Sequence, residues 1–336
     1  MATYKGIQGY SVEVLASDPT PTENHVGKLW YNTTAGAFKI AAEGTGAWAA
    51  GEDMPAIRGL CGGCGTKTAG LYVGGGYPTP TLNNAVEFDG TDWAIGGTMN
   101  QASIYATYTA GTQTACVAAG GYSETVPAGF PAATEEYNGT GWTTGNAMVD
   151  TGRDGGGCAG LQTAAIAFAG NQPGTKKQVE DYDGTNWTAG TDLSNDHARC
   201  MSAQAGTSTS TLCISGAVPG GNVEEWNGTS WTEVGVVNTA RQYGGGTGTV
   251  TSALIVAGYP AAGPSGTKNT ETEKYNGTAW TELGDITTAK AYLFGFGTTG
   301  SAVLAGGVTG PSSVANSLTN EIWSDPVYTA KTVTVS

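Results

Sequence analysis

The stretch EKYNGTAW, residues 273–280, decides the fold of this chain because the chain repeats it. Asn276-Gly277 separates two short segments of alternating polarity, which predicts a tight β-hairpin with a type I′ turn. Aligned on the final tryptophan, the hairpins are spaced by 49, 45, 44 and 49 residues, a period typical of repeat architectures. The copies are VEFDGTDW (86–93), EEYNGTGW (135–142), EDYDGTNW (180–187), EEWNGTSW (224–231) and EKYNGTAW (273–280).

Each hairpin follows two further segments of constant character. An apolar run that ends in small residues, such as LYVGGGY (71–77), indicates a buried strand. A glycine-rich segment, such as GLCGGCGT (59–66), precedes this run and indicates a narrow strand. Four short strands per period match one blade of a β-propeller, in which the innermost strands converge and must be narrow. Six copies of the first two strands predict an all-β, six-bladed propeller with four-stranded blades; seven blades are the alternative.

The order of these segments resembles the kelch repeat. A basic residue, a glycine-rich strand, an apolar strand ending in Gly-Gly and the Glu-x-Tyr-Asn/Asp-Gly-Thr-x-Trp hairpin follow one another over most of residues 45–325. The double glycine is complete only in some units, as at 74–76, 120–121 and 306–307. The resemblance implies a kelch-like β-propeller and no particular chemistry, because a fold does not fix function.

The two ends of the chain depart from the repeat. TGAWAAGE (45–52) reads as a fourth strand without its own first two, so we expect it to complete the last blade; VYTAKTVTVS (327–336) is the rival for that place. Closure by either strand removes exposed strand edges. We therefore expect an N-terminal extension or attachment segment (1–44), a propeller (45–325) and a C-terminal strand or tail (326–336).

The N-terminal extension contains PTPTENHVGKLWYNTTAGAFKI, residues 19–40. This segment resembles stretches near the start of phage tail-fibre and other virion proteins, with a proline-rich turn, Gly-x-Leu-Trp-Tyr-Asn-Thr-Thr and a short aliphatic strand. The resemblance implies a viral structural or adhesive protein. It also implies that the end segments dock to neighbouring virion subunits in a homo- or hetero-oligomeric assembly.

Composition excludes several classes of partner. The net charge of −14 and the pI of about 4.4 argue against binding to nucleic acid or to an anionic membrane surface. No apolar run reaches the length of a membrane-spanning helix, and MATYKGIQGY (1–10) lacks the apolar core of a signal peptide. We expect a virion protein made in the host cytoplasm, without membrane insertion.

A basic residue begins the first strand in five of the units. This set could form an anion site around one mouth of the channel, but the hairpin glutamates recur with similar regularity, so we expect structural ion pairs. The predicted acidic partners are Glu87, Glu136, Glu180, Glu225 and Glu321. The basic set consists of Arg58, Arg153, Arg199, Arg241 and Lys290, and the remaining unit has Ile104 in this place.

The regular hairpin aromatics are expected to pack between blades rather than to stack on a carbohydrate, because packing must repeat whereas a binding site is usually irregular. The set is Phe88, Tyr137, Tyr182, Trp226 and Tyr275, with the aligned tryptophans.

No catalytic set, metal site or cofactor site is predicted. The chain has two histidines, and Cys61-Gly-Gly-Cys64 is the only close pair among six cysteines, too few ligands for a structural zinc site. No glycine-rich phosphate loop lies between a strand and a helix. We expect the cysteines to be small buried side chains and the protein to be no enzyme.

The loops between second and third strands break the repeat, and they lie on one face of the predicted disc. Because loops on a rigid scaffold often carry binding, we expect any receptor or glycan contact here. The candidate residues are Tyr122, Phe130 and Tyr259. Simple drift in loop length is the alternative interpretation.

These observations favour a non-enzymatic phage virion structural protein, in the tail, tail fibre or capsid decoration, that binds proteins or the host surface through its propeller. A bacterial kelch-type protein-interaction or carbohydrate-binding module is the alternative. A propeller lyase or hydrolase is the remote alternative.

Overall fold

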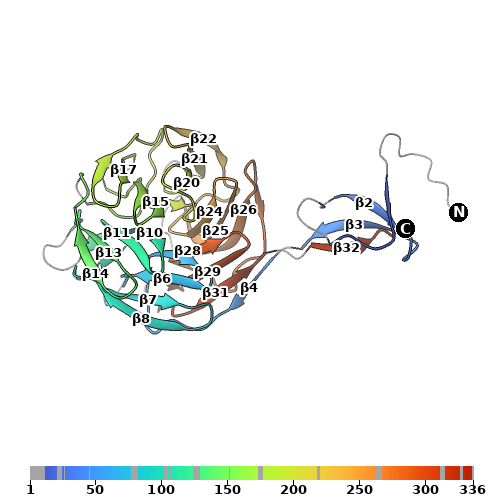
Figure 1. Ribbon diagram of the computed structural model, residues 1–336, viewed down its shortest axis with the longest axis horizontal. Helices are drawn as coiled ribbons and strands as arrows, with labels where there is room; N and C mark the ends of the chain where they lie inside the picture. The colour runs from blue at the N-terminus through green and yellow to red at the C-terminus, as the bar shows by residue number, and fades with distance from the viewer. Residues whose placement is uncertain are drawn as a thin grey trace. The chain divides into compact units, whose positions relative to one another are not determined.

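Each repeat of the sequence forms one antiparallel sheet in the computed structural model of the chain (Figure 1). The structure describes residues 12–20, 25, 27–44, 46–76, 82–101, 104–105, 107–123, 129–150, 152–172, 177–217, 220–261, 267–310, 315–325 and 328–334. These residues form strands and connecting segments and contain no α-helix. The chain divides into a terminal unit, Met1–Gly46 with Asp325–Ser336, and a repeat unit, Ala47–Ser324.

In the described residues of the repeat unit, six sheets are each built on four antiparallel strands, numbered here in chain order, and a two-stranded sheet lies apart from them. The four strands follow one another in sequence order in every sheet except the sixth. Sheet 1 consists of β5 (Gly62–Thr66), β6 (Ala69–Val73), β7 (Asn84–Phe88) and β8 (Trp93–Thr98). Sheet 2 consists of β10 (Tyr108–Thr112), β11 (Ala115–Ala119), β13 (Thr134–Tyr137) and β14 (Trp142–Gly145). Sheet 3 consists of β15 (Gly157–Leu161), β16 (Ala164–Phe168), β17 (Val179–Tyr182) and β18 (Trp187–Ala189).

Sheets 4 to 6 repeat this pattern with small additions. Sheet 4 consists of β19 (Met201–Ser202), β20 (Thr211–Ile214), β21 (Asn222–Trp226) and β22 (Trp231–Val236). Sheet 5 consists of β24 (Gly245–Thr249), β25 (Ser252–Pro260), β26 (Asn269–Tyr275) and β27 (Trp280–Glu282), and β23 (Arg241–Gln242) also pairs with β25. Sheet 6 consists of β28 (Ala291–Thr298), β29 (Ser301–Thr309), β31 (Asn320–Ser324) and β4 (Ala47–Ala50), and β30 (Ala315–Asn316) pairs with β29. The short strands β9 (Ile104–Tyr105) and β12 (Tyr122–Ser123) pair with each other.

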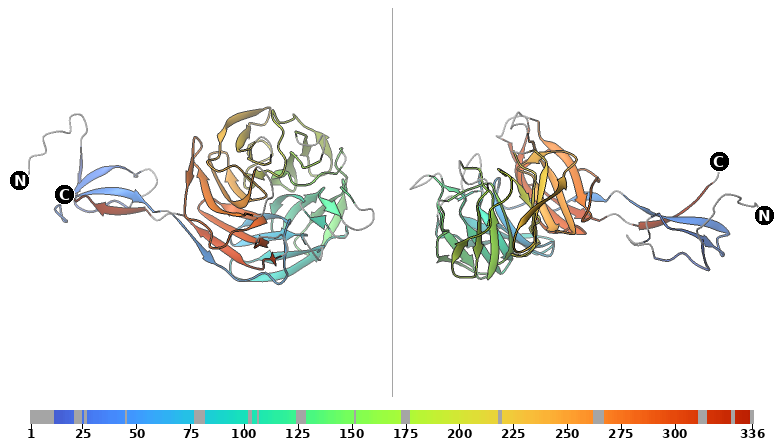
Figure 2. Two further views of the ribbon diagram at one scale, coloured as in Figure 1. Left: turned by 180° about the vertical axis from the view of Figure 1, so that it is seen from behind. Right: turned by 90° about the horizontal axis from the view of Figure 1, so that it is seen from above.

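The first strands of the six sheets contact one another in a circular order. Strand β5 contacts β10, β10 contacts β15, β15 contacts β19, β19 contacts β24, β24 contacts β28, and β28 contacts β5. The sheets accordingly lie around a common centre in both face-on views (Figures 1 and 2). This arrangement is consistent with a β-propeller.

The fourth strand of sheet 6 comes from the N-terminal side of the repeat unit. β4 pairs antiparallel with β31, with Trp48 opposite Trp323. The rival strand at the C-terminus, β32 (Tyr328–Thr332), pairs with β3 (Ala37–Glu43) in the terminal unit instead. The sequence offered no partner for this C-terminal strand, and the structure supplies one.

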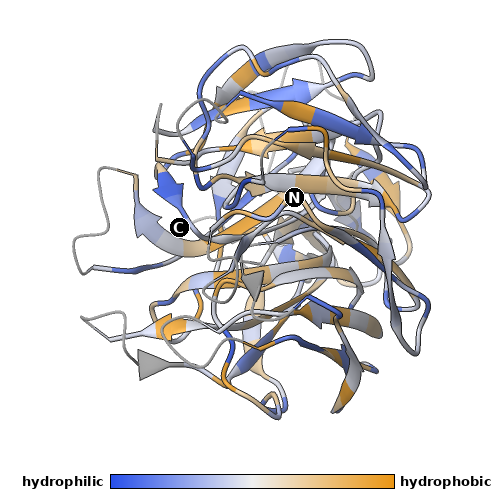
Figure 3. Cartoon of the chain, turned by 90° about the vertical axis from the view of Figure 1, so that its left-hand side faces the viewer, coloured by the Kyte–Doolittle hydropathy of each residue, from blue (hydrophilic) through white to orange (hydrophobic). Residues whose placement is uncertain are grey.

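The inner strands are narrow because neighbouring sheets leave no room for larger side chains. A Cβ added at Gly62 of β5 would lie 2.5 Å from Cγ2 of Thr109 in β10 of sheet 2. Cys64 in β5 and Cys158 in β15 occupy such small-residue positions and are buried. All six cysteines are buried free thiols, as expected from the repeat. Many of the hydrophobic residues, coloured orange in Figure 3, lie within the strands.

The incomplete double glycines have a conformational explanation. Two successive residues at the end of the second strand adopt positive φ in five of the six sheets, as at Ala257 (58°) and Gly258 (102°), and in sheet 3 Ala169 alone does so. The first position accepts alanine or serine, as at Ala169 and Ser215. The second position needs glycine, since a Cβ at Gly258 would lie 2.6 Å from the carbonyl oxygen of Gln242. Its N–H donates to the next sheet, at the carbonyl of Lys290.

The hairpin aromatics pack as the repeat predicts. Tyr137 and Trp142 stack across their hairpin with ring centroids 4.9 Å apart, and the equivalent pairs do the same. The indole N–H of Trp142 donates to the carbonyl of Gly97 in sheet 1. The hydroxyl of Tyr137 donates to Glu87 of the same preceding sheet. The aromatic set therefore joins neighbouring sheets and is not available for stacking on a carbohydrate.

The terminal unit is a separate four-stranded sheet in the order β1-β2-β3-β32, with β1 (Glu13–Leu15) parallel to β2 (Leu29–Asn32). Asp18 accepts hydrogen bonds from the Trp30 indole (2.9 Å) and the Asn32 amide (2.7 Å). The two hydrogen bonds lower the pKa of Asp18. One carboxylate thus fixes the loop that covers Trp30.

Substitutions at Gly258 and at Ala257 before it test whether only the second position needs glycine. We expect Gly258→Ala to lower the free energy of unfolding by roughly 1–3 kcal/mol, the range for a strained backbone conformation. Ala257→Gly should change it by less than about 1 kcal/mol, because relief of positive φ offsets the added chain entropy. Chemical denaturation of both variants measures the difference. Equal effects would contradict the conformational explanation.

Candidate binding site

Four of the five predicted basic residues are buried within the sheets instead of lining a channel mouth. Arg58, Arg153 and Arg241 are 0% exposed and Lys290 is 1% exposed. The ion pairs join Arg153 to Glu180 (3.6 Å), Lys290 to Glu321 (3.1 Å) and Arg241 to Glu273. Their role within this structure is internal pairing.

The fifth basic residue, Arg199, is out of register with the others. The residue two positions after each basic residue has positive φ, as at Tyr243 (56°) after Arg241. Arg199 itself has positive φ (60°), so His197 occupies the basic position of sheet 4. His197 is buried and pairs with Glu224 at 3.1 Å. Alignment on positive charge had selected the wrong residue.

The acidic partners are also shifted in the hairpins. Glu180 and Glu321 form the predicted ion pairs, but Glu224 does so in place of Glu225. Glu87 and Glu136 instead accept hydrogen bonds from tyrosines of the following sheets. Successive residues of a strand point to opposite faces, so a one-residue error exchanges the two roles.

The paired glutamates share a second contact, which we call the connector clamp, and Glu135, at the same place in sheet 2, makes this contact without an ion-pair partner among the described residues. Each carboxylate accepts backbone N–H groups from the segment that leads from the preceding sheet to its own. Glu135 binds the N–H groups of Asn100 and Gln101, both at 2.7 Å, and Glu273 binds those of Asn238 (2.7 Å) and Thr239 (3.0 Å). The further contacts are Glu180 with Val149, Glu224 with Ser194 and Asn195, and Glu321 with Thr287.

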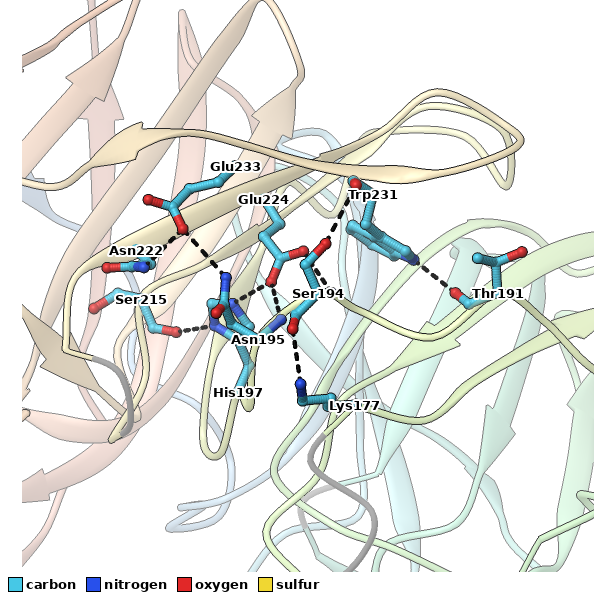
Figure 4. A network of polar contacts seen from close by, with 10 residues as sticks. All are labelled: Lys177, Thr191, Ser194, Asn195, His197, Ser215, Asn222, Glu224, Trp231 and Glu233. Carbon is cyan, nitrogen blue, oxygen red and sulfur yellow. Dashed lines mark hydrogen bonds and ion pairs between the residues drawn. The ribbon is translucent and has the colours of Figure 1, made fainter.

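The clamp of sheet 4 contains the only buried histidine among the described residues (Figure 4). Nδ1 of His197 lies 2.9 Å from the carbonyl oxygen of Ser215, and Nε2 lies 3.1 Å from Glu224. Both neighbours are acceptors, so the ring fits them as the doubly protonated imidazolium. Burial is the largest single effect and favours the neutral ring, but the hydrogen bonds to Glu224 and Ser215 and the electrostatic interactions with Cys200 and Glu224 together outweigh it, so the pKa of His197 is raised.

Removing the carboxylate should cost more where the cation cannot lose its proton. We expect Glu273→Gln to destabilise the fold by about 3–5 kcal/mol, because Arg241 stays charged and buried. Glu224→Gln should cost about 1–3 kcal/mol, since His197 can become neutral. Glu225→Gln, one residue away, is the control and should stay within about 1 kcal/mol. Urea unfolding would refute the clamp if all three variants behaved alike.

The same histidine predicts a pH dependence. Because its pKa is raised on folding, protonated His197 stabilises the protein below its ordinary pKa of about 6.5. This contribution is lost as pH rises through the folded value. Unfolding free energies measured from about pH 6 to about pH 9 should fall more for the natural protein than for His197→Lys, because lysine keeps its charge over this range. Parallel curves would exclude this role.

The residues with positive φ at the start of the first strands form a second repeated feature, which we call the mouth ring. The Leu60 N–H donates to the carbonyl of Tyr292 (2.8 Å), that of Tyr292 to Tyr243 (2.9 Å), and that of Tyr243 to Arg199 (3.1 Å). These bonds cross from sheet to sheet and hold bulky residues in a conformation that side chains disfavour. The mouth ring consists of Leu60, Gly155, Arg199, Tyr243 and Tyr292.

A pocket of about 60 Å³ lies inside the mouth ring, lined by residues of all six repeats. Tyr243 and Tyr292 line it with ring centroids 4.5 Å apart, and both are partly exposed. The guanidinium of Arg199 lies over the Tyr243 ring at 5.1 Å. First strands begin where second strands end, as Gly62 opposite Val73 shows. The pocket therefore lies on the face that carries the variable loops.

The three predicted binding residues differ in their exposure to solvent. Tyr122 and Phe130 are partly exposed and pack edge to face at 5.0 Å. Tyr259 is 1% exposed because β25 continues through it to Pro260, so it is not a loop residue. Its ring packs against that of Tyr292, with the ring centroids 5.3 Å apart, and so contacts the mouth ring. The central parts of the predicted loops, from 77–81 to 311–314, lie outside the described residues.

Sequence reasoning missed Tyr243 and Tyr292. A signal existed: both tyrosines stand where sheet 3 has Gly155, and Tyr243 is followed directly by three glycines. A large aromatic residue in such a place is unexpected for packing alone.

The described residues contain no group of three or more His, Cys, Asp and Glu side chains that could hold a metal ion. Among them no helix has the length and apolar character needed to cross a membrane. Comparison of the chain with protein-family models and with curated proteins gave no match.

Proposed function

We propose that this chain is a non-enzymatic structural protein of a phage virion, in the tail, tail fibre or capsid decoration. In this proposal the repeat unit is a six-bladed, kelch-like propeller that binds a host-surface or virion partner. The terminal unit attaches it to neighbouring subunits.

The observation that carries the proposal is that repeated and unrepeated residues lie in different places and make different contacts. The repeated Glu, Tyr and Trp side chains are used in contacts between neighbouring sheets, as Glu273, Tyr137 and Trp142 illustrate. The unrepeated polar and aromatic residues gather at the mouth ring and on the variable loops. A rigid scaffold with one variable face is typical of a binding module.

The terminal unit supports the attachment role. The segment that resembles virion proteins forms β2 and β3, and β32 from the far end of the chain completes the same sheet. Both ends of the repeat unit thus lead into one small sheet. A single sheet of this kind gains stability by packing against another layer, which a neighbouring subunit would supply.

Mass spectrometry of purified virions tests the proposal directly, and the chain should be present in the particle. Asp18→Ala should reduce its incorporation several-fold, because Trp30 and Asn32 lose their shared acceptor. Asp18→Asn, which keeps an acceptor oxygen, is the matched control. The thermal transition of the repeat unit should be unchanged in both. Absence of the chain from virions would refute the virion assignment.

A further inference from the structure

One buried polar side chain at the pocket inside the mouth ring lacks a hydrogen-bond partner within the described part of the chain. Thr107 is among the residues that line the pocket, and it is 7% exposed. Its Oγ1 has no hydrogen-bond partner among the described residues. A buried hydroxyl left unpaired costs about 1–3 kcal/mol. A ligand with a hydroxyl or carbonyl group would satisfy it.

Charged residues of opposite sign adjoin two residues that line the pocket, since Asp154 precedes Gly155 and Arg199 precedes Cys200. Asp154 is buried, and burial raises the pKa of its carboxyl group although Gln172 and Asn171 form hydrogen bonds with it; its Oδ1 lacks a partner among the described residues. Arg199 interacts electrostatically with Asp154, and its Nε also lacks a partner there. Gly155 lies between them, and a Cβ at this position would lie 3.7 Å from Arg199. One acceptor and one donor with cancelling charges suit a neutral ligand that carries several hydroxyl groups.

The aromatic rings add an apolar surface beside these groups. Tyr243 and Tyr292 are each partly exposed at the pocket. Tyrosine combines an apolar ring face with a polar hydroxyl, which matches the alternating C–H and O–H surfaces of a sugar ring. The positive φ of both residues, 56° and 60°, is maintained by the sheet-to-sheet hydrogen bonds of the mouth ring. The rings are therefore held in place before a ligand arrives.

The size of the pocket decides how such a ligand would lie. A volume of about 60 Å³ holds a small substituent or a few water molecules, but no complete sugar ring. The ring must then lie across the mouth, over the tyrosines, with one substituent directed inward. Thr107 is among the residues that such a substituent would meet.

We propose that the mouth ring binds the terminal unit of a neutral carbohydrate. The sugar ring packs on Tyr243 and Tyr292, Asp154 accepts from its hydroxyl groups and Arg199 donates to them. A hydroxymethyl or similar group enters the pocket and pairs with Thr107. This inference rests on the proposed binding role of the loop face and names the ligand class for it.

The purified full chain is first tested on an array of immobilised oligosaccharides. The array carries neutral ends (hexose, deoxyhexose and N-acetylhexosamine) and acidic ends (sialylated and sulfated). Neutral ends should bind, and the best of them is then used in titration calorimetry. Binding to acidic ends alone, or to none of the array, would overturn the proposal.

Variants then locate the site by calorimetry with the same oligosaccharide. Tyr243→Ala and Arg199→Gln should each weaken binding about tenfold or more, equivalent to about 1.4 kcal/mol. Leu161→Ala, at an exposed position on the far end of β15, is the control and should bind normally. Unchanged affinity in both site variants would overturn the proposed site.

Thr107→Val separates a ligand contact from a structural role. It removes an unpaired buried hydroxyl, so it should raise the Tm of the free protein while weakening sugar binding. A structural hydroxyl would give the opposite change in Tm and leave affinity intact. The virion assignment is judged separately, since a chain present in virions that binds no neutral sugar refutes this inference alone.

Discussion

The buried carboxylate of the connector clamp is the interaction on which the arrangement of the sheets depends. A glutamate on a third strand holds the segment by which its own sheet is joined to the one before it, as Glu135 holds Asn100 and Gln101. Hydrogen bonds from backbone N–H groups to a charged acceptor replace the water that the carboxylate loses on burial. The clamp therefore fixes where each new first strand begins, and with it the contact between neighbouring first strands.

The cation beside this carboxylate is the more variable partner. It is arginine in sheets 3 and 5, histidine in sheet 4 and lysine in sheet 6, and sheet 2 has Ile104 at the equivalent place. Sheet 1 reverses the arrangement, with Val86 in the acidic position and Arg58 bonded to the backbone and side chain of Asn84. Burial lowers the pKa of Arg58 to about 10. Backbone donors and acceptors can thus stand in for either charge.

The sequence predicted the repeated hairpins and narrow strands well because these depend on local chemistry and on a strict period. The predicted type I′ turn is wrong, because four residues separate Tyr275 from Trp280 and only Gly277, not Asn276, has positive φ. The sequence predicted the ionic contacts poorly because charge is a weak marker of register. Arg199 carries the same charge as the other basic residues, but its positive φ shows that it lies two residues after the basic position of its sheet, which His197 occupies. Glu224 and Glu225 are identical in type and differ only in the face of β21 to which they point. The variable loops were the predicted place for binding, whereas the proposed contacts Tyr243 and Tyr292 lie at the start of first strands.

The pairing of β4 with β31 has a consequence for the order in which the protein is made. Strand β4 leaves the ribosome first among the strands of the repeat unit, and its partner leaves last. Until then β4 has no partner strand, and the face of sheet 1 that packs on sheet 6, where Tyr72 contacts Phe296, stays uncovered. Contacts between residues so distant in sequence form slowly, since a long loop must close before they gain anything. Sheet 6 is therefore complete only after the whole repeat unit has been synthesised. The net charge of −14 helps the incompletely folded chain to resist association until then.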